Sequence, residues 1–236
     1  MTRGVASPAL SIIIPVLNEA NRLAGTLEAL APLRAAGAEL IVVDGGSSDG
    51  SIAIAARFAD RVLETTRGRA TQMNAGAAAA RGPILLFLHA DNRLPKHADQ
   101  AVLEAIASGH HWGRFDVRIE GDSLWLPVVA GMMNWRSHLT GIATGDQAIF
   151  VSRGAFHTAR GFPELPLMED IALSQRLLKV GRPACLAVQV ATSGRRWETH
   201  GVLRTILLMW QLRLRYFLGA DPHRLALEYG YAARRS

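Results

Sequence analysis

The apolar and polar positions in the N-terminal part of the chain alternate between two kinds of segment. Residues 10–17 and 40–43 are apolar runs rich in β-branched side chains, which is typical of strands buried on both faces of a parallel sheet. Leucine and alanine recur with helical spacing in the segments between such runs. The pattern predicts strands at residues 10–17, 40–43, 61–64 and 84–88, and helices at residues 23–37, 51–58 and 70–80. This alternation predicts an α/β fold with a mostly parallel central sheet and helices on both faces.

The pattern becomes less regular after Pro95. It predicts a helix to about residue 107, a half-exposed strand at 113–119, an apolar stretch at 124–142, a strand at 147–151 and a helix at 168–180. No Pro/Ser-rich linker or internal repeat separates the two halves, so we expect a single Rossmann-like domain over residues 1–236. We expect a nucleotide-binding half at about residues 8–110, an acceptor half at about 111–200 and a C-terminal helical segment at 201–236.

The segment at residues 202–218 has two interpretations. Bulky apolar residues are interrupted there by Arg204, Arg213 and Arg215. It is either an amphipathic helix that packs on the sheet, or a helix that lies on a membrane surface with its arginines at headgroup level. The longest uncharged stretch, residues 123–135, is shorter than the roughly 20 residues that span a bilayer, so no spanning helix is expected.

Composition and charge narrow the class of protein. The 236 residues are 49% hydrophobic and 19% charged, which excludes a disordered chain. The single cysteine, Cys185, excludes an intramolecular disulfide and fits a reducing compartment. The net charge of +6 comes almost entirely from arginine, which favours phosphate-bearing partners, and no nucleic-acid-binding motif is present. Because the first apolar run lacks a signal-peptide cleavage site, we expect a cytoplasmic protein, peripheral on the inner face of the plasma membrane if residues 202–218 bind lipid.

Acidic residues follow two of the predicted strands. Asp44 comes directly after a buried strand and opens a glycine-rich loop, where a carboxylate is well placed to bind a nucleobase or ribose. Asp49, at the end of the same loop, is expected to cap the next helix. Asp91 follows the strand at 84–88, where a carboxylate could hold Mg²⁺ or Mn²⁺ against a diphosphate, or could simply form a turn. These carboxylates are expected to meet at the carboxyl edge of the sheet.

Glu169 and Asp170 begin a predicted helix. Acidic residues in a first turn complement the helix dipole, and that alone accounts for them. Alternatively, one of the two carboxylates is a general base that deprotonates an incoming hydroxyl. Spacing does not choose between these interpretations.

Six segments occur in the order found in family 2 glycosyltransferases. They are SIIIPVLNE at 11–19, VVDGGSSDG at 42–50, GRATQMNAG at 68–76, FLHAD at 87–91, GDQ at 145–147 and MED at 168–170. The chain resembles this family, most closely its short bacterial subgroup of arsenosugar-biosynthesis-type or radical-SAM/selenodomain-associated transferases. The resemblance implies a GT-A fold, a nucleotide-diphosphate sugar donor, Mn²⁺ or Mg²⁺ as cofactor, and inversion at the anomeric carbon of the sugar.

The resemblance also implies roles for individual residues. The nucleotide-sugar site would comprise Pro15, Glu19, Asp44, Arg69, His89, Ala90, Asp91 and Arg196. The acceptor would meet Asp146, Gln147 and Trp197. Asp170 would be the general base, with Glu169 beside it, and Asp91 would bind the metal. His200 would complete the metal site, as a downstream histidine does in some GT-A enzymes, or is an ordinary surface or core histidine.

The chain departs from the family pattern at three places. Gly45 stands where the family commonly has a second acid after the second strand, so Asp44 would contact the base alone. His89 replaces the first acid of the Asp-X-Asp motif, and imidazole is a poorer ligand for Mg²⁺ than for Mn²⁺. Ser193 replaces the glutamine of the Gln-X-X-Arg-Trp motif of processive synthases, so processive synthesis is not supported.

Two other functions compete with glycosyl transfer. One is a nucleotidyltransferase-like enzyme on a similar sheet. A nicotinamide-dependent oxidoreductase is disfavoured, because the first strand is not followed by the Gly-X-Gly-X-X-Gly motif. The other is a non-catalytic membrane-surface protein built on a transferase fold, which the 202–218 segment and the imperfect acidic motif suggest. We expect a small or lipid-linked acceptor and, for the membrane interpretation, contact with anionic lipid.

Overall fold

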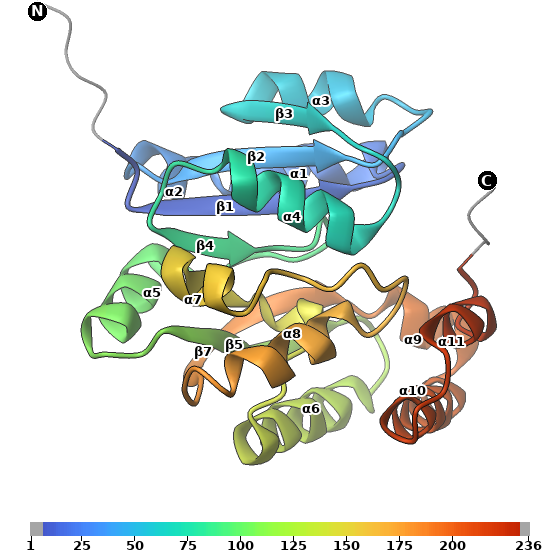
Figure 1. The fold of residues 1–236 in the computed structure, drawn as a ribbon. Helices are drawn as coiled ribbons and strands as arrows, with labels where there is room; N and C mark the ends of the chain where they lie inside the picture. The colour runs from blue at the N-terminus through green and yellow to red at the C-terminus, as the bar shows by residue number, and fades with distance from the viewer. Residues whose placement is uncertain (1–6, 232–236) are drawn as a thin grey trace, which may run out of the picture.

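The computed structural model describes residues 7–231, and its centre is a seven-stranded sheet (Figure 1). The strands lie in the order β3-β2-β1-β4-β6-β5-β7, and β6 runs antiparallel to both of its neighbours while the other pairs are parallel. Their bounds are β1 Leu10–Val16, β2 Glu39–Asp44, β3 Arg61–Glu64, β4 Ile84–Phe87, β5 Trp112–Glu120, β6 Phe150–Ser152 and β7 Ala184–Ser193. The predicted mostly parallel α/β sheet is confirmed.

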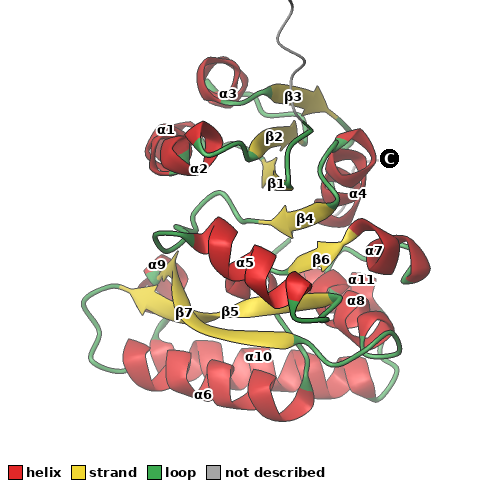
Figure 2. Ribbon diagram, turned by 90° about the vertical axis from the view of Figure 1, so that its left-hand side faces the viewer, coloured by secondary structure: helices red, strands yellow, loops and turns green. Residues whose placement is uncertain are grey.

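Helices cover both faces of this sheet (Figure 2). One face carries α1 Ala20–Ala29, α2 Ala31–Ala35, α3 Ser51–Phe58, α5 Ala98–Ala107 and α6 Leu126–Thr140. The opposite face carries α4 Arg69–Ala79, α7 Arg153–Thr158 and α8 Glu169–Leu177. The chain continues into α9 Arg195–His200, α10 Val202–Phe217 and α11 Pro222–Glu228.

The residues of β1 show why the sheet has two cores. Ile12 and Ile14 pack into the cluster on the α1 side, whereas Ile13 packs into the cluster on the α4 side, and none of the three is exposed. Alternate side chains of a strand point to opposite faces, so an unbroken apolar run fills both cores. Helix α4 approaches β1 so closely that a Cβ at Gly76 would lie 2.4 Å from the Ile13 side chain.

A buried carboxylate joins three segments at the amino edge of the sheet. Glu39, which begins β2, is 2% exposed. Its carboxylate accepts hydrogen bonds from the Ser11 hydroxyl (2.7 Å), the Arg81 backbone N–H (2.8 Å) and Arg81 Nε (2.7 Å). Burial alone would raise the pKa of Glu39, but these hydrogen bonds and the Arg81 charge hold it below its usual range. The ionised carboxylate therefore stabilises the fold.

The variant Glu39→Gln should lower the free energy of unfolding by about 1–3 kcal/mol, because its amide leaves a buried donor unpaired. The pKa of Glu39 is lower in the folded than in the unfolded chain, so its stabilisation is present above the unfolded pKa and is lost as the pH falls through the folded pKa. Urea titrations should show the gap between wild type and variant closing below about pH 4. The exposed Glu28→Gln in α1 is the control, and a gap that does not change with pH would contradict this role.

The second half of the chain differs from its predicted elements. The apolar stretch at 124–142, to which no element was assigned, forms the helix α6. The predicted strand at 147–151 is displaced, because residues 145–147 form a 3₁₀ turn and β6 begins at Phe150. Strand β7 was not predicted. It is an edge strand whose middle residues are half-buried or exposed, so it lacks the apolar run that marks the inner strands.

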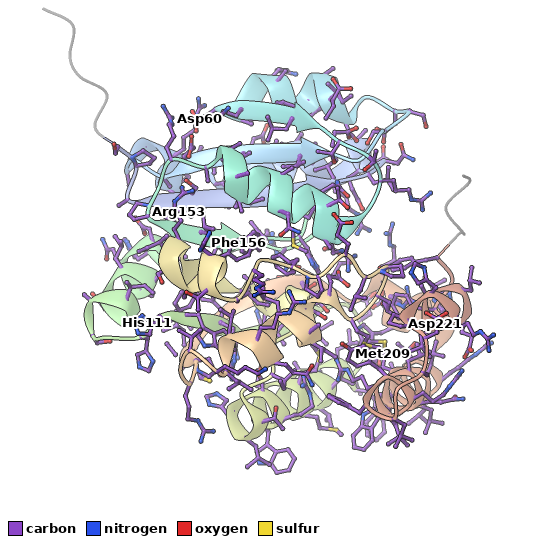
Figure 3. The ribbon with its side chains drawn as sticks, viewed as in Figure 1. Asp60, His111, Arg153, Phe156, Met209 and Asp221 are labelled. Atoms are coloured by element: carbon purple, nitrogen blue, oxygen red, sulfur yellow. The ribbon has the colours of Figure 1, made fainter. Side chains whose placement is uncertain are left out.

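The C-terminal helices form a separate small core against the start of α8. Leu212 of α10 and Leu225 of α11 are fully buried there with Ile142, Met168 and Ile171. Asp221, labelled in Figure 3, caps the start of α11. Its carboxylate accepts a hydrogen bond from the His223 backbone N–H. The predicted helix at 202–218 is therefore present and packs through a narrow buried stripe. Within the described residues, none of the helices has both the length and the apolar character that crossing a bilayer requires.

Candidate active site

The loops that follow β1 and β2 are joined by hydrogen bonds at the carboxyl edge of the sheet. The Asn18 side chain accepts from the Ser48 backbone N–H at 2.8 Å, and the Asn18 backbone N–H donates to the Ser47 hydroxyl at 2.9 Å. The Asp49 carboxylate accepts from the backbone N–H of Ala20 and of Ser51, the first residues of α1 and α3. Asp49 therefore binds two helix N-termini at once, which extends its predicted capping role.

Asp44 lies at the end of β2 and is 1% exposed. Its carboxylate accepts hydrogen bonds from the backbone N–H of Gly46 and of Ser47, both at 2.7 Å, and from the Ser47 hydroxyl. Gly46 has a φ of 90°, a conformation that favours glycine. Asp44 thus stabilises the loop that follows it through these hydrogen bonds. Its contact with a nucleobase stays a prediction.

The end of β4 meets the 3₁₀ turn η1 Gly145–Gln147. His89 Nδ1 lies 3.3 Å from a carboxylate oxygen of Asp146, and the buried Asn92 side chain donates to the Asp146 carbonyl at 3.1 Å. A Cβ at Gly145 would lie 2.3 Å from the His89 ring, so only glycine allows this approach. His89 and Asp146, predicted separately as donor and acceptor residues, are therefore direct neighbours.

Glu169 and Asp170 stand at the first turn of α8. One Asp170 oxygen accepts from the Gly145 backbone N–H at 2.8 Å and the other from the Ile171 backbone N–H at 2.7 Å. Glu169 is 3% exposed and lies 3.4 Å from Arg69 Nη1. A small pocket between β4 and α8 is lined by His89, Gly145, Glu169 and Asp170, with Phe87 and Phe162 among its apolar walls. The two predicted catalytic acids therefore open onto one pocket.

Burial and neighbouring charges shift the pKa values of two carboxyl groups at the site in opposite directions. Burial, together with the neighbouring Asp170 charge, raises the pKa of Glu169 even though Arg69 opposes the shift. Burial would also raise the pKa of Asp146, but the His89 hydrogen bond and the charges of Arg69 and Arg213 hold it below its usual range. Asp146 is therefore the ionised group, whereas Glu169 is the one most ready to hold a proton.

Asp91 is the candidate metal ligand. Its carboxylate has no hydrogen-bond donor among residues 7–231, and together with burial its charge raises the pKa of Glu19. Those residues hold no group of three or more histidine, cysteine, aspartate or glutamate side chains arranged for a metal. A hard divalent cation nevertheless fits, because Mg²⁺ and Mn²⁺ in nucleotide sites take one or two carboxylates and complete their shell with phosphate and water oxygens.

The structure does not bring every predicted residue to this pocket. His200 is exposed, and its Nδ1 lies 3.2 Å from the Arg196 carbonyl. Arg196 stacks 3.6 Å from the centre of the Tyr229 ring and donates to the Tyr229 carbonyl. Trp197 packs against the α1-side core. The roles implied for these three residues stay predictions without a contact to support them.

Three further predicted residues serve the fold. Gln147 is fully buried, and its side chain accepts from the Thr144 backbone N–H at 3.2 Å, which argues against direct contact with an acceptor. The carbonyl of Ala90 accepts from the Thr26 hydroxyl at 2.6 Å. Pro15 lies within β1, paired with Val43 of β2.

Sequence reasoning missed the arginines that stand near Asp170. The Asp170 charge acts on the pKa of Arg136 in α6 and on that of Arg213 in α10, opposing the lowering that burial causes. Arg213 was noticed as an interruption of an apolar helix, and that was the one signal available. Gln72 was also missed as a structural residue, although its amide bridges the ends of β1 and β2 by donating to the carbonyls of Val16 and Val43, both at 2.8 Å.

The comparison with protein families agrees with this arrangement. The model of the family described as "Glycosyl transferase family 2" matches residues 11–161, which include the ends of β1, β2 and β4 and the turn at Gly145. The chain belongs to this family. The expected family is confirmed, whereas the arsenosugar-type subgroup is not.

Relatives and solved structures extend the comparison. A Mycobacterium bovis protein named PGL/p-HBAD biosynthesis glycosyltransferase is 40% identical over 114 residues, which are 45% of this chain and 44% of that protein. The mannosyltransferase PcManGT from Pyrobaculum calidifontis, in complex with GDP-Man and Mn²⁺, has a TM-score of 0.66 at 20% identity and covers 96% of this chain and 66% of its own. S. aureus TarS 1-349, in complex with UDP-GlcNAc, has a TM-score of 0.64 at 18% identity and covers 78% and 58%. This family 2 chain thus has the GT-A fold and spans under half the length of that curated relative.

Proposed function

We propose that this protein is an inverting glycosyltransferase that moves a sugar from a nucleotide-diphosphate sugar to an acceptor hydroxyl. The observation that carries the proposal is the position of Asp170. Its carboxylate lines the pocket at the carboxyl end of β4 and is oriented by the 2.8 Å hydrogen bond from Gly145. That edge is where open α/β sheets bind their ligands. Family membership and the donor-bound neighbours of the same fold support the same reaction.

In the proposed reaction Asp170 accepts the proton of the acceptor hydroxyl. The hydroxyl oxygen forms a bond to the anomeric carbon from the face opposite the diphosphate. The bond between that carbon and the diphosphate oxygen breaks, and its electron pair leaves with the nucleoside diphosphate. One displacement of this kind inverts the configuration at the anomeric carbon.

Charge on the leaving diphosphate needs stabilisation where it develops. Arg69, at the start of α4, is the proposed diphosphate contact, and the buried Glu169 at 3.4 Å orients it. Asp91 would hold the divalent cation, which when bound supplies positive charge to the phosphate oxygens. Asp44 and Glu19 would line the nucleotide end, and Asp146 would face the acceptor beside His89.

Calorimetric titration with UDP, GDP, CDP and dTDP, each with and without Mn²⁺, tests this proposal. We expect one nucleotide to bind and Mn²⁺ to strengthen its binding. A folded protein that binds none of the four would contradict a glycosyltransferase function. Product analysis with the matching donor distinguishes a glycosyltransferase from a nucleotidyltransferase. The former releases the nucleoside diphosphate, whereas the latter releases pyrophosphate.

We further propose that the protein contacts anionic membrane through its α6 and α10 sides, which both lie along the base of the molecule in Figures 1 and 2. Large apolar side chains on these sides are exposed, and we call them together the apolar face. Its residues are Leu124, Trp125, Val128, Met132, Trp135, Leu139, Leu203, Leu207, Trp210, Leu214, Phe217 and Leu218. Tryptophan favours the membrane interface, and exposed Arg204 on α10 complements anionic headgroups. A lipid-linked acceptor fits this placement, whereas the subgroup resemblance favours a small arsenosugar-like acceptor.

Vesicle flotation measures this contact. The protein should float with phosphatidylcholine vesicles that contain phosphatidylglycerol, and the double variant Trp210→Glu/Leu214→Glu should remain at the bottom, because charges inserted among the exposed apolar residues oppose burial in lipid. Leu103→Glu, at an exposed position on α5, is the control. A double variant that floats as wild type does would contradict the membrane contact.

A further inference from the structure

Gln147 is a fully buried polar residue to which the proposed reaction gives no role. It lies in the core at the end of the 3₁₀ turn η1, and it does not line the pocket beside Asp170. Burying an amide side chain is costly unless its donor and its acceptor are both hydrogen-bonded, and an apolar side chain of similar size would fill the same space without that cost. The partners of the Gln147 amide therefore indicate what the residue does.

The two ends of the Gln147 amide join the turn to the sheet. Its oxygen accepts a hydrogen bond from the Thr144 backbone N–H at 3.2 Å, which closes the turn over Gly145. Its nitrogen donates at 3.4 Å to the side-chain oxygen of Asn134 in α6. Asn134 is itself fixed to β5, because its side chain accepts from the Val117 backbone N–H at 2.8 Å and donates to the Val117 carbonyl at 3.0 Å. Gln147 thus connects the backbone next to Gly145 to α6 and β5.

Two other buried polar side chains hold the same turn from different elements. Asn92, in the loop after β4, donates to the Asp146 carbonyl at 3.1 Å. The Ser174 hydroxyl of α8 accepts from the Ala143 backbone N–H at 3.1 Å, just before the turn. Asn92 and Ser174, like Gln147, are fully buried. The turn is therefore bonded to the loop after β4, to α8 and, through Gln147, to α6.

The turn presents one backbone group to the proposed base. The Gly145 backbone N–H donates at 2.8 Å to one Asp170 carboxylate oxygen, while the other oxygen accepts from the Ile171 backbone N–H. Gly145 also packs against the His89 ring, which leaves no room for a side chain. The turn is followed by the fully buried Ala148, whose φ of 47° is unfavourable for a residue other than glycine and persists only where the surrounding structure imposes it. The bonds that hold the turn therefore determine where the Gly145 N–H points.

We propose that Gln147 is a positioning residue for the reaction, which keeps the Gly145 N–H directed at the Asp170 carboxylate. This inference rests on the proposed function, because that function makes Asp170 the general base. A base must lie within hydrogen-bond reach of the hydroxyl that it deprotonates, so a carboxylate that turns away slows the reaction even while the substrates stay bound. Gln147 therefore acts on the chemical step and not on the binding of the nucleotide.

Hydrogen exchange followed by NMR tests this role without donor or acceptor. Gln147→Met keeps the length of the side chain but removes both hydrogen bonds of the amide. The Gly145 amide should then exchange about tenfold faster, as expected for the loss of two bonds that hold the turn, while the amides of β1 change only as far as global stability does. Glu39→Gln is the matched control, because it disrupts the hydrogen bonds of a buried side chain at the opposite, amino edge of the sheet. It should lower the Tm and leave the exchange of the Gly145 amide at the wild-type rate.

Turnover distinguishes positioning of the base from a purely structural role. The rate is measured as release of nucleoside diphosphate from the matching donor, with water as the hydroxyl acceptor. Gln147→Met should lower this rate about tenfold in the wild-type background but less than about twofold in the Asp170→Asn background, because the position of the base has no effect once the base is removed. Nucleotide affinity, measured by calorimetry, should stay within about twofold of wild type in each variant.

A Gly145 amide that exchanges at the wild-type rate in Gln147→Met would overturn the positioning role, and so would losses of turnover that multiply in the double variant. If Gln147→Met does not fold, Gln147→Asn carries the test, because its amide is one methylene shorter and loses at least one of the two hydrogen bonds. Faster exchange of the Gly145 amide is expected of that variant as well. An Asp170→Asn variant with unchanged turnover would overturn the proposed base and leave the exchange result standing, so the two failures are distinguishable.

Discussion

Asp170→Asn should reduce the rate of sugar transfer by about 10²–10⁴-fold while the affinity for the donor nucleotide stays within about twofold of wild type. The substitution removes the proton acceptor and keeps the size of the side chain, and the oxygen that it retains accepts one of the two hydrogen bonds from Gly145 and Ile171. The rate is measured as release of nucleoside diphosphate from the matching donor and acceptor. The affinity is measured by calorimetry on the same preparation.

A matched control separates the chemistry of Asp170 from its position in a helix. Asp99 is likewise an acidic residue in the first turn of its helix, α5, and has no contact with the pocket. Asp99→Asn should transfer sugar at the wild-type rate. An Asp170→Asn variant with near wild-type turnover would exclude Asp170 as the general base. A variant that lost both sugar transfer and nucleotide binding would show that the residue is structural.

Asp91→Ala should abolish the increase in nucleotide affinity that Mn²⁺ produces, and leave metal-free binding unchanged. Residues that merely support metal ligands change metal affinity by about 10–100-fold, so loss of a direct ligand is expected to cost at least that much. The described residues hold no group of three or more histidine, cysteine, aspartate or glutamate side chains that could bind the metal in place of Asp91. Paired titrations of wild type and variant, with and without Mn²⁺, measure it.

The control for Asp91→Ala removes the same charge elsewhere. Asp122 is exposed in the loop after β5, and Asp122→Ala should keep the full response to Mn²⁺. Asp91→Ala should also lower the pKa of Glu19, because burial and the Asp91 charge together raise it in the wild-type protein. An Asp91→Ala variant whose nucleotide affinity still rises with Mn²⁺ would assign the metal to other groups.

The acidic residues near the sheet edge were found from the sequence because parallel strands end at one edge. Asp44, Asp91 and the loop at Asp49 each follow a buried apolar run, so their approximate location followed from the strands. What each carboxylate does there was not predictable in the same way. Asp44 accepts hydrogen bonds from Gly46 and Ser47 of its own loop. Asp49 joins two helix N-termini because the backbone N–H of Ala20, 29 residues earlier in the chain, donates to it together with that of Ser51.

The acceptor side was less predictable than the nucleotide side. Strand β7 and helix α6 carry no pattern as clear as the inner strands, because one side of each remains exposed. Gln147 was placed in the site from its motif, but the 3₁₀ turn rotates it into the core. Arg136 and Arg213 are separated by most of the C-terminal half, so nothing in their spacing indicated that the Asp170 charge influences the pKa of both.

The sequence by itself determined the α/β class, the inner strands and the family, because these follow from local apolar periodicity and from short ordered motifs. Only the tertiary structure decided which of the motif residues share a pocket. It placed His89 against Asp146 and oriented Asp170 through Gly145, and Arg196, Trp197 and His200 do not line the same pocket. The reason is that the positions of these side chains depend on packing between helices and loops far apart in the chain, which no local pattern encodes.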